Sequence, residues 1–450
     1  MTLHLYDTQS RQLQPVASVN GSTSMYCCGP TVYRDAHVGN LRTFLLSDLI
    51  SRTLSVAGSK VTLIQNITDV GHMSEDFQEA DKLLTQANIE KIEPLEIARK
   101  YEASFHKDLA RLNIGAATAY PRASESIELM QSLITQLLSK SCAYLGSDGA
   151  VYFDAHSYPS YGAISGNRLS SLKPGHNYEY NEDGVKRFHA DWALWKLAGD
   201  RSQMVWPSPW GVGFPGWHIE CSAMSLAFLN NHVDVHVGGI DLRFPHHENE
   251  RAQSNAVTGT ETVDIWVHGE HLLFEGRKMS KSSGNVVLLQ DVVDRGFDPL
   301  ALRLCLLESR YRSQMDLTWA AIASAAQTLN RWREKLVLWG DTTNVEVDAE
   351  VEAAFNNDLD TPKALIRLRA IEKSNLVNKR EIFLYADQVL GLKLAAGVER
   401  KVLTPQMHKL LQDRIQARSE KRWSDSDELR AQLEELGLVL KDTPKGQSWS

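Results

Sequence analysis

In the first 66 residues, apolar residues form two short continuous runs, with a stretch of helical spacing between them. The segments 24–29 and 60–66 are short apolar runs, and each predicts a buried strand. Between them, apolar residues recur at helical spacing from Leu41 to Leu49, in a helix that should end near Gly58. A strand, a helix and a strand form a βαβ unit, whose ligands bind at the carboxyl ends of the strands. This pattern places at one rim Cys28, Thr31, His37 and the segment 66–68.

The remainder of the chain changes pattern twice. Turns rich in glycine, proline and tyrosine interrupt residues 120–205, which predicts an inserted subdomain before a second α/β run begins near Trp217. From Trp319 onward the periodicity becomes helical, with a long helical run from Pro405. The last expected features are a capping box at Ser424 and Asp427, a helix stop at Gly437 and a small terminal hairpin.

Composition narrows the class of protein without naming a function. With 43% hydrophobic and 23% charged residues, the chain is typical of a folded globular protein, which excludes collagen-like, coiled-coil and wholly disordered classes. The net charge of −8 means that a nucleic acid would have to be held by local basic patches. Five cysteines are too few and too scattered for a disulfide framework. Residues 1–18 lack a basic segment followed by an apolar one, and no uncharged apolar run reaches about 18 residues. We therefore expect a cytoplasmic protein without a membrane partner.

Two short motifs, far apart in the chain, suit phosphate binding. His37-Val-Gly-Asn40 opens the first predicted helix, where amide groups and an imidazole donor can meet an anion. Lys278-Met-Ser-Lys281 places two lysines three residues apart in a loop of small residues that could fold over a triphosphate. Taken singly, the first motif is typical of a histidine in a turn and the second of a solvated basic loop. In this order and separation, they resemble the paired ATP signatures of class I aminoacyl-tRNA synthetases.

Cysteine, histidine and glutamate residues form a second constellation. Cys28 ends the first strand, Cys221 lies far downstream, and His246 and Glu250 share one helix face at the i, i+4 spacing. Two thiolates, one imidazole and one carboxylate make a plausible tetrahedral zinc set. Buried apolar cysteines and helix-capping histidines would produce the same pattern. Spacing alone does not choose between Cys27 and Cys28, or between His246 and His247.

Longer motifs give the chain a specific resemblance to the cysteinyl-tRNA synthetase family. The motifs are Cys28-Gly-Pro-Thr-Val-Tyr33, Asn66-Ile-Thr-Asp69, Gly216-Trp-His-Ile-Glu-Cys-Ser-Ala-Met224, Gly238-Gly-Ile-Asp-Leu-Arg-Phe-Pro-His-His-Glu-Asn-Glu250 and Lys278-Met-Ser-Lys-Ser282. The resemblance extends to Asn357-Asp-Leu-Asp-Thr-Pro362 and to Gly446-Gln-Ser-Trp449, and so covers nearly the whole chain. Two positions depart from the family pattern: Arg34, where the family usually has Asp, and Asn40, where it often has His.

The resemblance implies an α/β fold with several parts. A Rossmann-type nucleotide-binding catalytic domain with an insertion is followed by an α-helical anticodon-binding domain and a small C-terminal α+β tail. The expected boundaries are 1–120 for the first catalytic half, 121–205 for the inserted subdomain, 206–270 for the second catalytic half with the zinc site, 271–320 for the lysine loop and stem-contact region, 321–400 for the helical tRNA-binding domain and 401–450 for the tRNA-recognition tail. A monomer is expected.

The family implies a two-step reaction on L-cysteine, ATP and cysteine tRNA. Cysteine attacks the α-phosphate of ATP to give cysteinyl-adenylate and pyrophosphate, and the ribose hydroxyl at the tRNA 3′ end then takes the cysteinyl group. The first step depends on positioning and on stabilisation of phosphate charge. The resemblance assigns that role, together with Mg²⁺, to His37, Asn40, Lys278 and Lys281. It adds Thr31, Gly239 and Asp241 to the ATP site, although Asp241 would also suit a turn cap.

The resemblance also selects one zinc set, with one Zn²⁺ per chain: Cys28, Cys221, His246 and Glu250. Cysteine and serine are close in size, but a thiolate binds zinc far better than an alcohol does. Zinc can therefore select the substrate by its sulfur. The expected cysteine pocket consists of Cys28, Gly29, Thr31, Thr68 and Trp217, although Trp217 would also suit a plain core position.

Recognition of tRNA is expected from the C-terminal part of the chain. Six basic residues follow the lysine loop, where an RNA backbone could pass or where they could be solvated helix faces: Arg303, Arg310, Arg312, Arg331, Arg333 and Lys335. Trp449 suits a structural hairpin as well as stacking on a base. One alternative is a tRNA-independent cysteine ligase of mycothiol biosynthesis, which lacks this tail. Another is a catalytically idle RNA-binding paralogue, against which the intact His37 and lysine motif argue.

Overall fold

The chain divides into two compact units. A computed structural model describes residues 2–18, 20–71, 81–174, 184–279, 284–340, 342–396, 404–436, 438, 440–443 and 446–449. The first unit comprises Met1–Leu329 and Thr342–Lys393, and the second comprises Asn330–Asp341 and Leu394–Ser450. The domain boundaries expected from the sequence are finer than this division and stay predictions. None of the helices within the described ranges combines the length and the apolar character that a membrane crossing requires.

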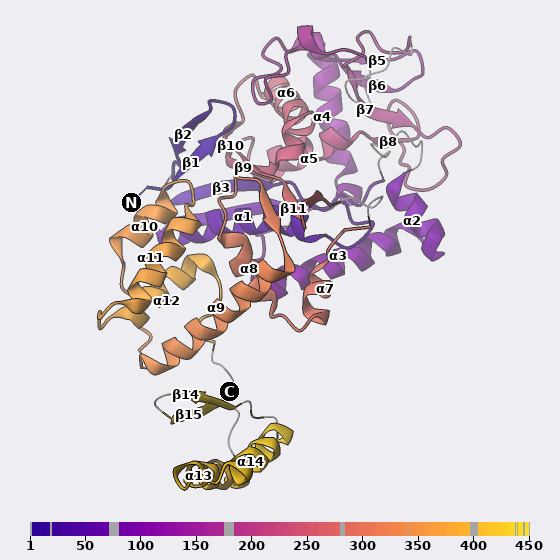
Figure 1. Ribbon diagram of the computed structural model, residues 1–450. Helices are drawn as coiled ribbons and strands as arrows, with labels where there is room; N and C mark the ends of the chain where they lie inside the picture. The colour runs from indigo at the N-terminus through magenta and orange to yellow at the C-terminus, as the bar shows by residue number, and fades with distance from the viewer. Residues whose placement is uncertain are drawn as a thin grey trace. The chain divides into compact units, whose positions relative to one another are not determined.

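A four-stranded parallel sheet lies at the centre of the first unit (Figure 1). Its strand order is β10 (Val263–Gly269), β9 (Val233–Gly239), β3 (Ser22–Cys27) and β4 (Lys60–Gln65). The helix α1 (Val38–Val56) connects β3 to β4, which confirms the predicted βαβ unit, and α6 (His246–Thr258) lies between β9 and β10. The two crossovers leave the middle of the sheet in opposite directions. Right-handed connections therefore put α1 and α6 on opposite faces, and ligands bind in such folds where the direction reverses, between β3 and β9.

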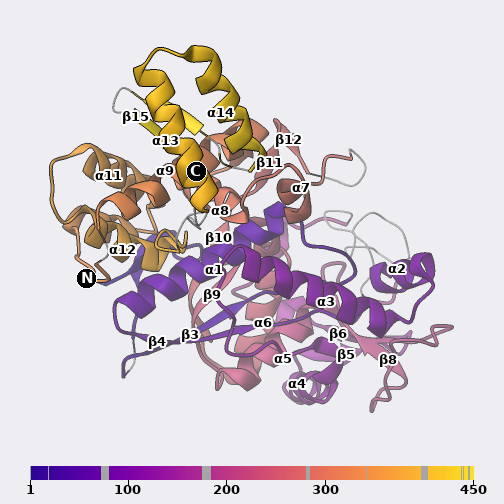
Figure 2. The ribbon, with the colours of Figure 1, turned by 90° about the horizontal axis from the view of Figure 1, so that it is seen from below.

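Burial explains why these segments form the centre of the unit. Every residue of β9 is buried, as expected for a parallel strand that is covered on both faces. The predicted apolar face of α1 is also buried, and its Phe44 packs edge-on against Phe105 of α3 (Pro94–Arg111), with ring centroids 5.0 Å apart. Figure 2 shows α1 and α3 beside each other. The start of α1 is thus held at the carboxyl end of β3.

A second, antiparallel sheet lies in the chain between β4 and α5 (Trp217–Phe228), in the region where the sequence predicts an insertion. It follows α4 (Ile127–Ser139) and contains β5 (Ala143–Leu145), β6 (Val151–Phe153), β7 (Trp192–Leu197) and β8 (Gly213–Pro215). Its buried Phe153 and Trp192 belong to the same hydrophobic core as Cys221 and Met224 of α5. The insertion therefore supports the helix that carries one of the candidate metal ligands.

Smaller elements complete the first unit. The strands are β1 (His4–Asp7), β2 (Gln12–Pro15), β11 (Leu272–Phe274), β12 (Arg277–Lys278) and β13 (Met315–Leu317). The helices are α2 (Lys82–Glu90), α7 (Leu289–Asp294), α8 (Pro299–Leu307), α10 (Ala349–Asn356), α11 (Thr361–Lys373) and α12 (Lys379–Leu390), with short 3₁₀ helices at Ala123–Glu125, Ala155–Ser157, Leu169–Ser171 and Ile240–Arg243. The long helix α9 (Trp319–Leu338) confirms that the pattern turns helical at Trp319.

Besides the end of α9 from Asn330, the described residues of the second unit form two helices and a hairpin. These are α13 (Pro405–Ser419), α14 (Trp423–Glu435), and the antiparallel strands β14 (Leu440–Thr443) and β15 (Gly446–Trp449), which confirm the predicted hairpin. The predicted capping box is wrong, because α14 already begins at Trp423 and Ser424 lies inside its first turn. Arg422 occupies the N-cap without a side-chain cap and pairs instead with Asp425. The predicted stop at Gly437 lies outside the described residues.

Candidate functional site

Four candidate metal ligands meet at the carboxyl end of β3. Cys28 follows the strand directly, Cys221 lies on α5, and His246 and Glu250 lie one turn apart on α6. The Sγ atoms of Cys28 and Cys221 are 3.9 Å apart, and Sγ of Cys28 is 3.5 Å from Oε1 of Glu250. Nε2 of His246 is 3.0 Å from the same oxygen. All four side chains are buried, and their ligand atoms lie within 4.8 Å of one another.

The donor set fits a zinc ion. Two thiolates, each about 2.3 Å from a tetrahedral zinc, lie roughly 3.8 Å apart, which is close to the separation of Cys28 and Cys221. Oε2 of Glu250 is buried and has no hydrogen-bond partner among the described residues, with Nε2 of His236 3.6 Å away, so it suits a cation. Thiolate, imidazole and carboxylate are also the ligand types that zinc prefers. The residues therefore suit the metal that the family resemblance implies.

The structure separates the two adjacent cysteines. Sγ of Cys27 lies 3.7 Å from Nε2 of Gln65, and burial raises the pKa of this thiol to about 12. Cys27 belongs to neither of the clusters that include Cys28. Because successive residues of a strand point to opposite faces, only one cysteine of the pair can face α5 and α6. That cysteine is Cys28.

The two adjacent histidines are both close to the cluster. Nε2 of His247 is 3.3 Å from Sγ of Cys28, and Nε2 of His236 is 3.5 Å from the same atom. With Cys28 and Glu250 these histidines form a second candidate donor set. Sequence reasoning missed His236, whose only signal is a polar residue in the apolar run of β9. The choice of His246 as the ligand therefore stays a prediction.

Electrostatic coupling holds protons in this cluster. Burial and the nearby Cys221 raise the pKa of Cys28 well above its usual range, whereas the hydrogen bond from Cys28 lowers the pKa of Cys221. Burial opposes charge on His246, yet the carboxylate of Glu250 raises its pKa to about 10. Burial and the surrounding histidines lower the pKa of His247 well below its usual range. Such a cluster releases protons when its donors bind a metal.

Polar groups of the loops after β3 and β4, where cysteine binding is expected, lie beside the cluster. Oδ1 of Asn66 accepts the amide N–H of Gly29 at 2.8 Å and lies 3.7 Å from Sγ of Cys221. Thr31 and Thr68 pair through their backbones. Gly29 allows this close approach, because a Cβ there would stand 1.5 Å from the carbonyl oxygen of Asn66. The loops after β3 and β4 are thus held together.

Side chains of α5 and α6 also lie beside the cluster and these loops. The half-buried ring of Trp217, at the start of α5, packs on that of His246 with centroids 4.3 Å apart. Oγ1 of Thr68 donates to Oε2 of Glu220 at 3.0 Å. This bond lowers the pKa of Glu220, but burial has the larger effect and raises that pKa well above its usual range. Sequence reasoning missed Glu220, which stands next to Cys221 within a quoted motif. The structure therefore brings together all five expected pocket residues: Cys28, Gly29, Thr31, Thr68 and Trp217.

His37 caps the start of α1 and faces the same rim. Its Nδ1 accepts the amide N–H groups of Gly39 and Asn40 at 3.1 and 3.2 Å, while Oδ1 of Asn40 accepts the amide N–H of His37 at 3.2 Å. These bonds assign the ring proton to Nε2, which is then a donor. Burial, followed by the charge of Arg34, lowers the pKa of His37 to about 4. At neutral pH the ring is an uncharged donor.

The described residues that flank the lysine loop lie near the start of α1. A Cβ on Gly39 would stand 3.0 Å from the side-chain methyl carbon of Met279, and the amide of Val38 donates to the carbonyl of Val287 at 3.0 Å. Lys278 is exposed on β12, where its carbonyl accepts Nδ2–H of Asn285 at 3.1 Å. Of the second predicted phosphate motif, the structure thus places Met279 beside the first motif. Lys281 lies outside the described residues.

Gly239 and Asp241 lie at the end of β9. Gly239 is the last residue of the strand, and Asp241 is exposed in the short helix that follows it. A Cβ on Gly239 would stand 2.3 Å from Oδ1 of Asp241, so glycine allows the carboxylate to fold back over the strand end. This position, next to β3, is where a nucleotide binds in folds of this kind.

Arg303 is not available to RNA, contrary to the sequence-based expectation. It is completely buried and bonds to Asp48 and to three backbone carbonyls. Its helix α8 is apolar, so its only polar side chain is drawn into the core. Arg310 and Arg312, from the same predicted cluster, pair with Asp360 and Asp358. These basic side chains therefore hold protein elements together.

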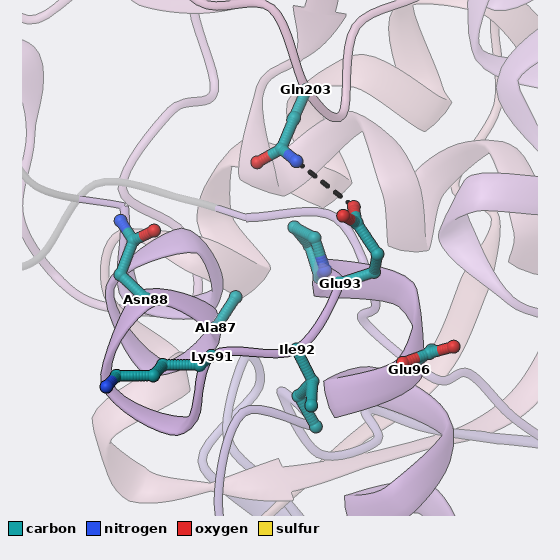
Figure 3. A pocket seen from close by; sticks show the side chains of 8 residues that line it. Ala87, Asn88, Lys91, Ile92, Glu93, Glu96 and Gln203 are labelled. Atoms are coloured by element: carbon teal, nitrogen blue, oxygen red, sulfur yellow. Dashed lines mark hydrogen bonds between the residues drawn. The ribbon is translucent and has the colours of Figure 1, made fainter.

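A separate cavity of about 440 Å³ lies between α2 and α3 (Figure 3). Nε2 of Gln203 donates to Oε2 of Glu93 at 3.1 Å across its edge. Its lining consists of Ala87, Asn88, Lys91, Ile92, Glu93, Pro94, Glu96 and Gln203. None of the predicted site residues is among them.

Comparisons with known proteins find aminoacyl-tRNA synthetases as relatives over the whole length of the chain. The family of class I (C) tRNA synthetase catalytic domains matches residues 14–327, and the cysteinyl-tRNA ligase anticodon binding domain matches residues 400–449. The cysteine–tRNA ligase of Thermus thermophilus is 40% identical over 100% of this chain and 99% of its own. That of Deinococcus radiodurans is 38% identical over 99% and 96%. A solved methionyl-tRNA synthetase of Mycobacterium tuberculosis, in complex with methionyl-adenylate, is similar in fold (TM-score 0.55, 14% identity, 82% of this chain and 90% of that one).

Proposed function

The chain belongs to the cysteinyl-tRNA synthetase family of class I enzymes, and on this premise we propose that it activates L-cysteine with ATP and transfers it to the 3′ end of cysteine tRNA. One observation carries the proposal: two cysteines, a histidine and a glutamate are buried together at the strand ends where the fold binds its ligands. Met279 and Val287, which lie on either side of the undescribed residues 280–283, contact the start of α1.

We propose that Cys28, Cys221, His246 and Glu250 hold one Zn²⁺. The short separations of their donor atoms and the buried Oε2 atom of Glu250 support this assignment. When bound, zinc supplies a soft Lewis acid that prefers a thiolate to an alcohol and so distinguishes cysteine from serine. The remaining pocket residues orient the amino acid around its sulfur, with Trp217 as one wall.

In the first step, a carboxylate oxygen of cysteine attacks the α-phosphorus of ATP, and the bond from that phosphorus to the bridging oxygen breaks. Pyrophosphate leaves, and no protein nucleophile is required. Nε2–H of His37, the side-chain amide of Asn40 and the ammonium of Lys278 donate to phosphate oxygens in this proposal. Lys281 has the same role by family resemblance, and ATP enters as its magnesium complex.

The adenosine is held on the other side of the switch point between β3 and β9. We assign Asp241 to the ribose hydroxyls and Thr31 to the ATP site, while Gly239, which has no side chain, allows the nucleotide to approach the backbone. In the second step, a ribose hydroxyl of tRNA attacks the carbonyl carbon of the adenylate, and AMP leaves. Residues 400–449, which match an anticodon-binding domain, are proposed to hold the tRNA. A cytoplasmic monomer stays a prediction.

Two assays on the same preparation test this function. Cysteine-dependent exchange between ATP and pyrophosphate measures the first step, and charging of transcribed cysteine tRNA measures the second. We expect both activities. Exchange without charging would indicate the tRNA-independent ligase, and a protein that shows neither activity while binding RNA would be an idle paralogue.

A further inference from the structure

The hydroxyl of Thr68 has two protein partners, and both are buried. Oγ1 donates to Oε2 of Glu220 at 3.0 Å and accepts Nδ2–H of Asn66 at 3.0 Å. Thr68 is 3% exposed, Asn66 1% and Glu220 0%. Because bulk water does not reach these groups, their hydrogen bonds determine which way the hydroxyl points.

This hydrogen-bond chain connects directly to the candidate metal cluster. Asn66 fixes its amide orientation by accepting the N–H of Gly29 at 2.8 Å through Oδ1, which lies 3.7 Å from Sγ of Cys221. Glu220 precedes Cys221 on α5, so one helix supplies both a candidate metal ligand and the acceptor for Thr68. The hydroxyl is therefore held in a fixed position relative to Cys221, one of the candidate metal ligands.

A hydroxyl has one hydrogen and two lone pairs. In Thr68 the hydrogen is given to Glu220, and one lone pair is used by Asn66. The position that is left on Oγ1 is a lone pair, which can accept a hydrogen bond but cannot donate one. An ammonium group has three donors and no acceptor. The arrangement therefore matches the free amino group of an amino acid.

We propose that Glu220 is a positioning residue that makes Thr68 an acceptor for the ammonium group of the substrate cysteine, an inference that rests on the proposed function. Without an acceptor at Oε2, the Thr68 hydrogen could rotate toward the ammonium, and two donors would then face each other. The hydrogen bond that orients the Thr68 hydroxyl needs an acceptor oxygen on residue 220 and does not need a negative charge there.

Replacing Glu220 tests the proposal. Glu220→Met removes the acceptor at similar volume, and we expect it to raise the KM for cysteine in pyrophosphate exchange about tenfold, as for the loss of one hydrogen bond to a charged group. The KM for ATP and the bound zinc should be unchanged. Glu220→Gln keeps an acceptor oxygen, so its cysteine KM should stay near that of the wild type. Equal damage in both variants would overturn the acceptor argument.

A substrate analogue separates positioning from general damage. 3-Mercaptopropionate has the thiol and the carboxylate of cysteine but no amino group. Its inhibition constant should be the same for the wild type and for Glu220→Met, because it offers Thr68 no donor. An equal rise in the inhibition constant and in the cysteine KM would show that the substitution disturbs the whole pocket, and would overturn the proposal.

Thr68→Val completes the test. If Glu220 acts through Thr68, Glu220→Met should have little further effect on the cysteine KM in the Thr68→Val background, whereas additive effects would refute the link. If Glu220→Met does not fold, Thr68→Val alone must raise the cysteine KM and leave the inhibition constant of 3-mercaptopropionate unchanged. Failure of the proposed function is distinct, because the wild type itself would then show no cysteine-dependent exchange.

Discussion

The role of Arg303 can be tested directly. Its position in the sequence suggested RNA binding, whereas its surroundings in the structure indicate that it stabilises the fold. Its Nη2 donates to Oδ2 of Asp48 at 2.6 Å, and its other nitrogens reach the carbonyls of Leu390, Leu112 and Asn113 at 2.6, 2.9 and 2.9 Å. The guanidinium thus joins α1, the segment after α3 and the end of α12 inside the first unit. We predict that Arg303→Met destabilises this unit.

The expected magnitude follows from what is left behind. Removing one partner of a buried ion pair costs about 3–5 kcal/mol, and carbonyls that lose their donor increase the cost. Asp48 keeps two partners, the guanidinium of Arg52 at 2.8 Å and the amide of Gly115 at 2.8 Å, which limits the loss. We therefore expect the free energy of unfolding to fall by about 4 kcal/mol.

Denaturant unfolding followed by tryptophan fluorescence measures this change. Arg369→Met is a matched control, because Arg369 pairs with Glu308 at the surface and its loss should cost less than about 1 kcal/mol. Binding of tRNA to folded Arg303→Met should have the wild-type affinity and salt dependence. Unchanged unfolding together with weaker, less salt-dependent tRNA binding would refute the structural role and restore the RNA contact.

Three further predictions concern the site. Cys221→Ser should lose zinc and cysteine activation together, measured by metal analysis and pyrophosphate exchange; a wild-type protein without zinc, active after chelation, would contradict this. Lys281→Ala should slow adenylate formation by about 2–4 kcal/mol in barrier height while cysteine binding stays nearly unchanged; an unchanged single-turnover rate would remove Lys281 from the mechanism. Burial lowers the pKa of His37 to about 4, so NMR should show a neutral ring down to about pH 5. A titration midpoint of His37 above pH 6 would contradict this prediction. Since an unfolded histidine binds its proton near pH 6.5, stability should fall as the pH drops from about 6.5 to 4, and His37→Gln should reduce this loss.

Local patterns in the sequence were sufficient for much of the fold. The strands β3 and β4, the helix between them, the helical region from Trp319 and the terminal hairpin all follow from periodicity, turn residues and apolar runs. These signals are local, because a strand or helix buries one face at a fixed spacing. The capping box at Ser424 failed for the same reason: two residue types at the right spacing do not determine where a helix begins.

The candidate site could be assembled from motifs only as a set of alternatives. Spacing left open the choices between Cys27 and Cys28 and between His246 and His247. The family resemblance selected Cys28 and His246, together with Cys221 and Glu250. Only the strand geometry turns Cys27 into the core and Cys28 toward α5 and α6, because alternate residues of a strand face opposite ways. Whether His246 or His247 is a ligand depends on contacts that neither spacing nor this packing decides.

Long-range packing decided what no local pattern contains. The burial of Arg303 depends on Asp48, which is 255 positions away, and the bond between Thr68 and Glu220 joins residues 152 positions apart. By itself, the sequence determined which residue types were present and which short elements carried them. The tertiary structure decided which charges face each other in the dry interior, where an unpaired polar group is costly and each donor must therefore find an acceptor.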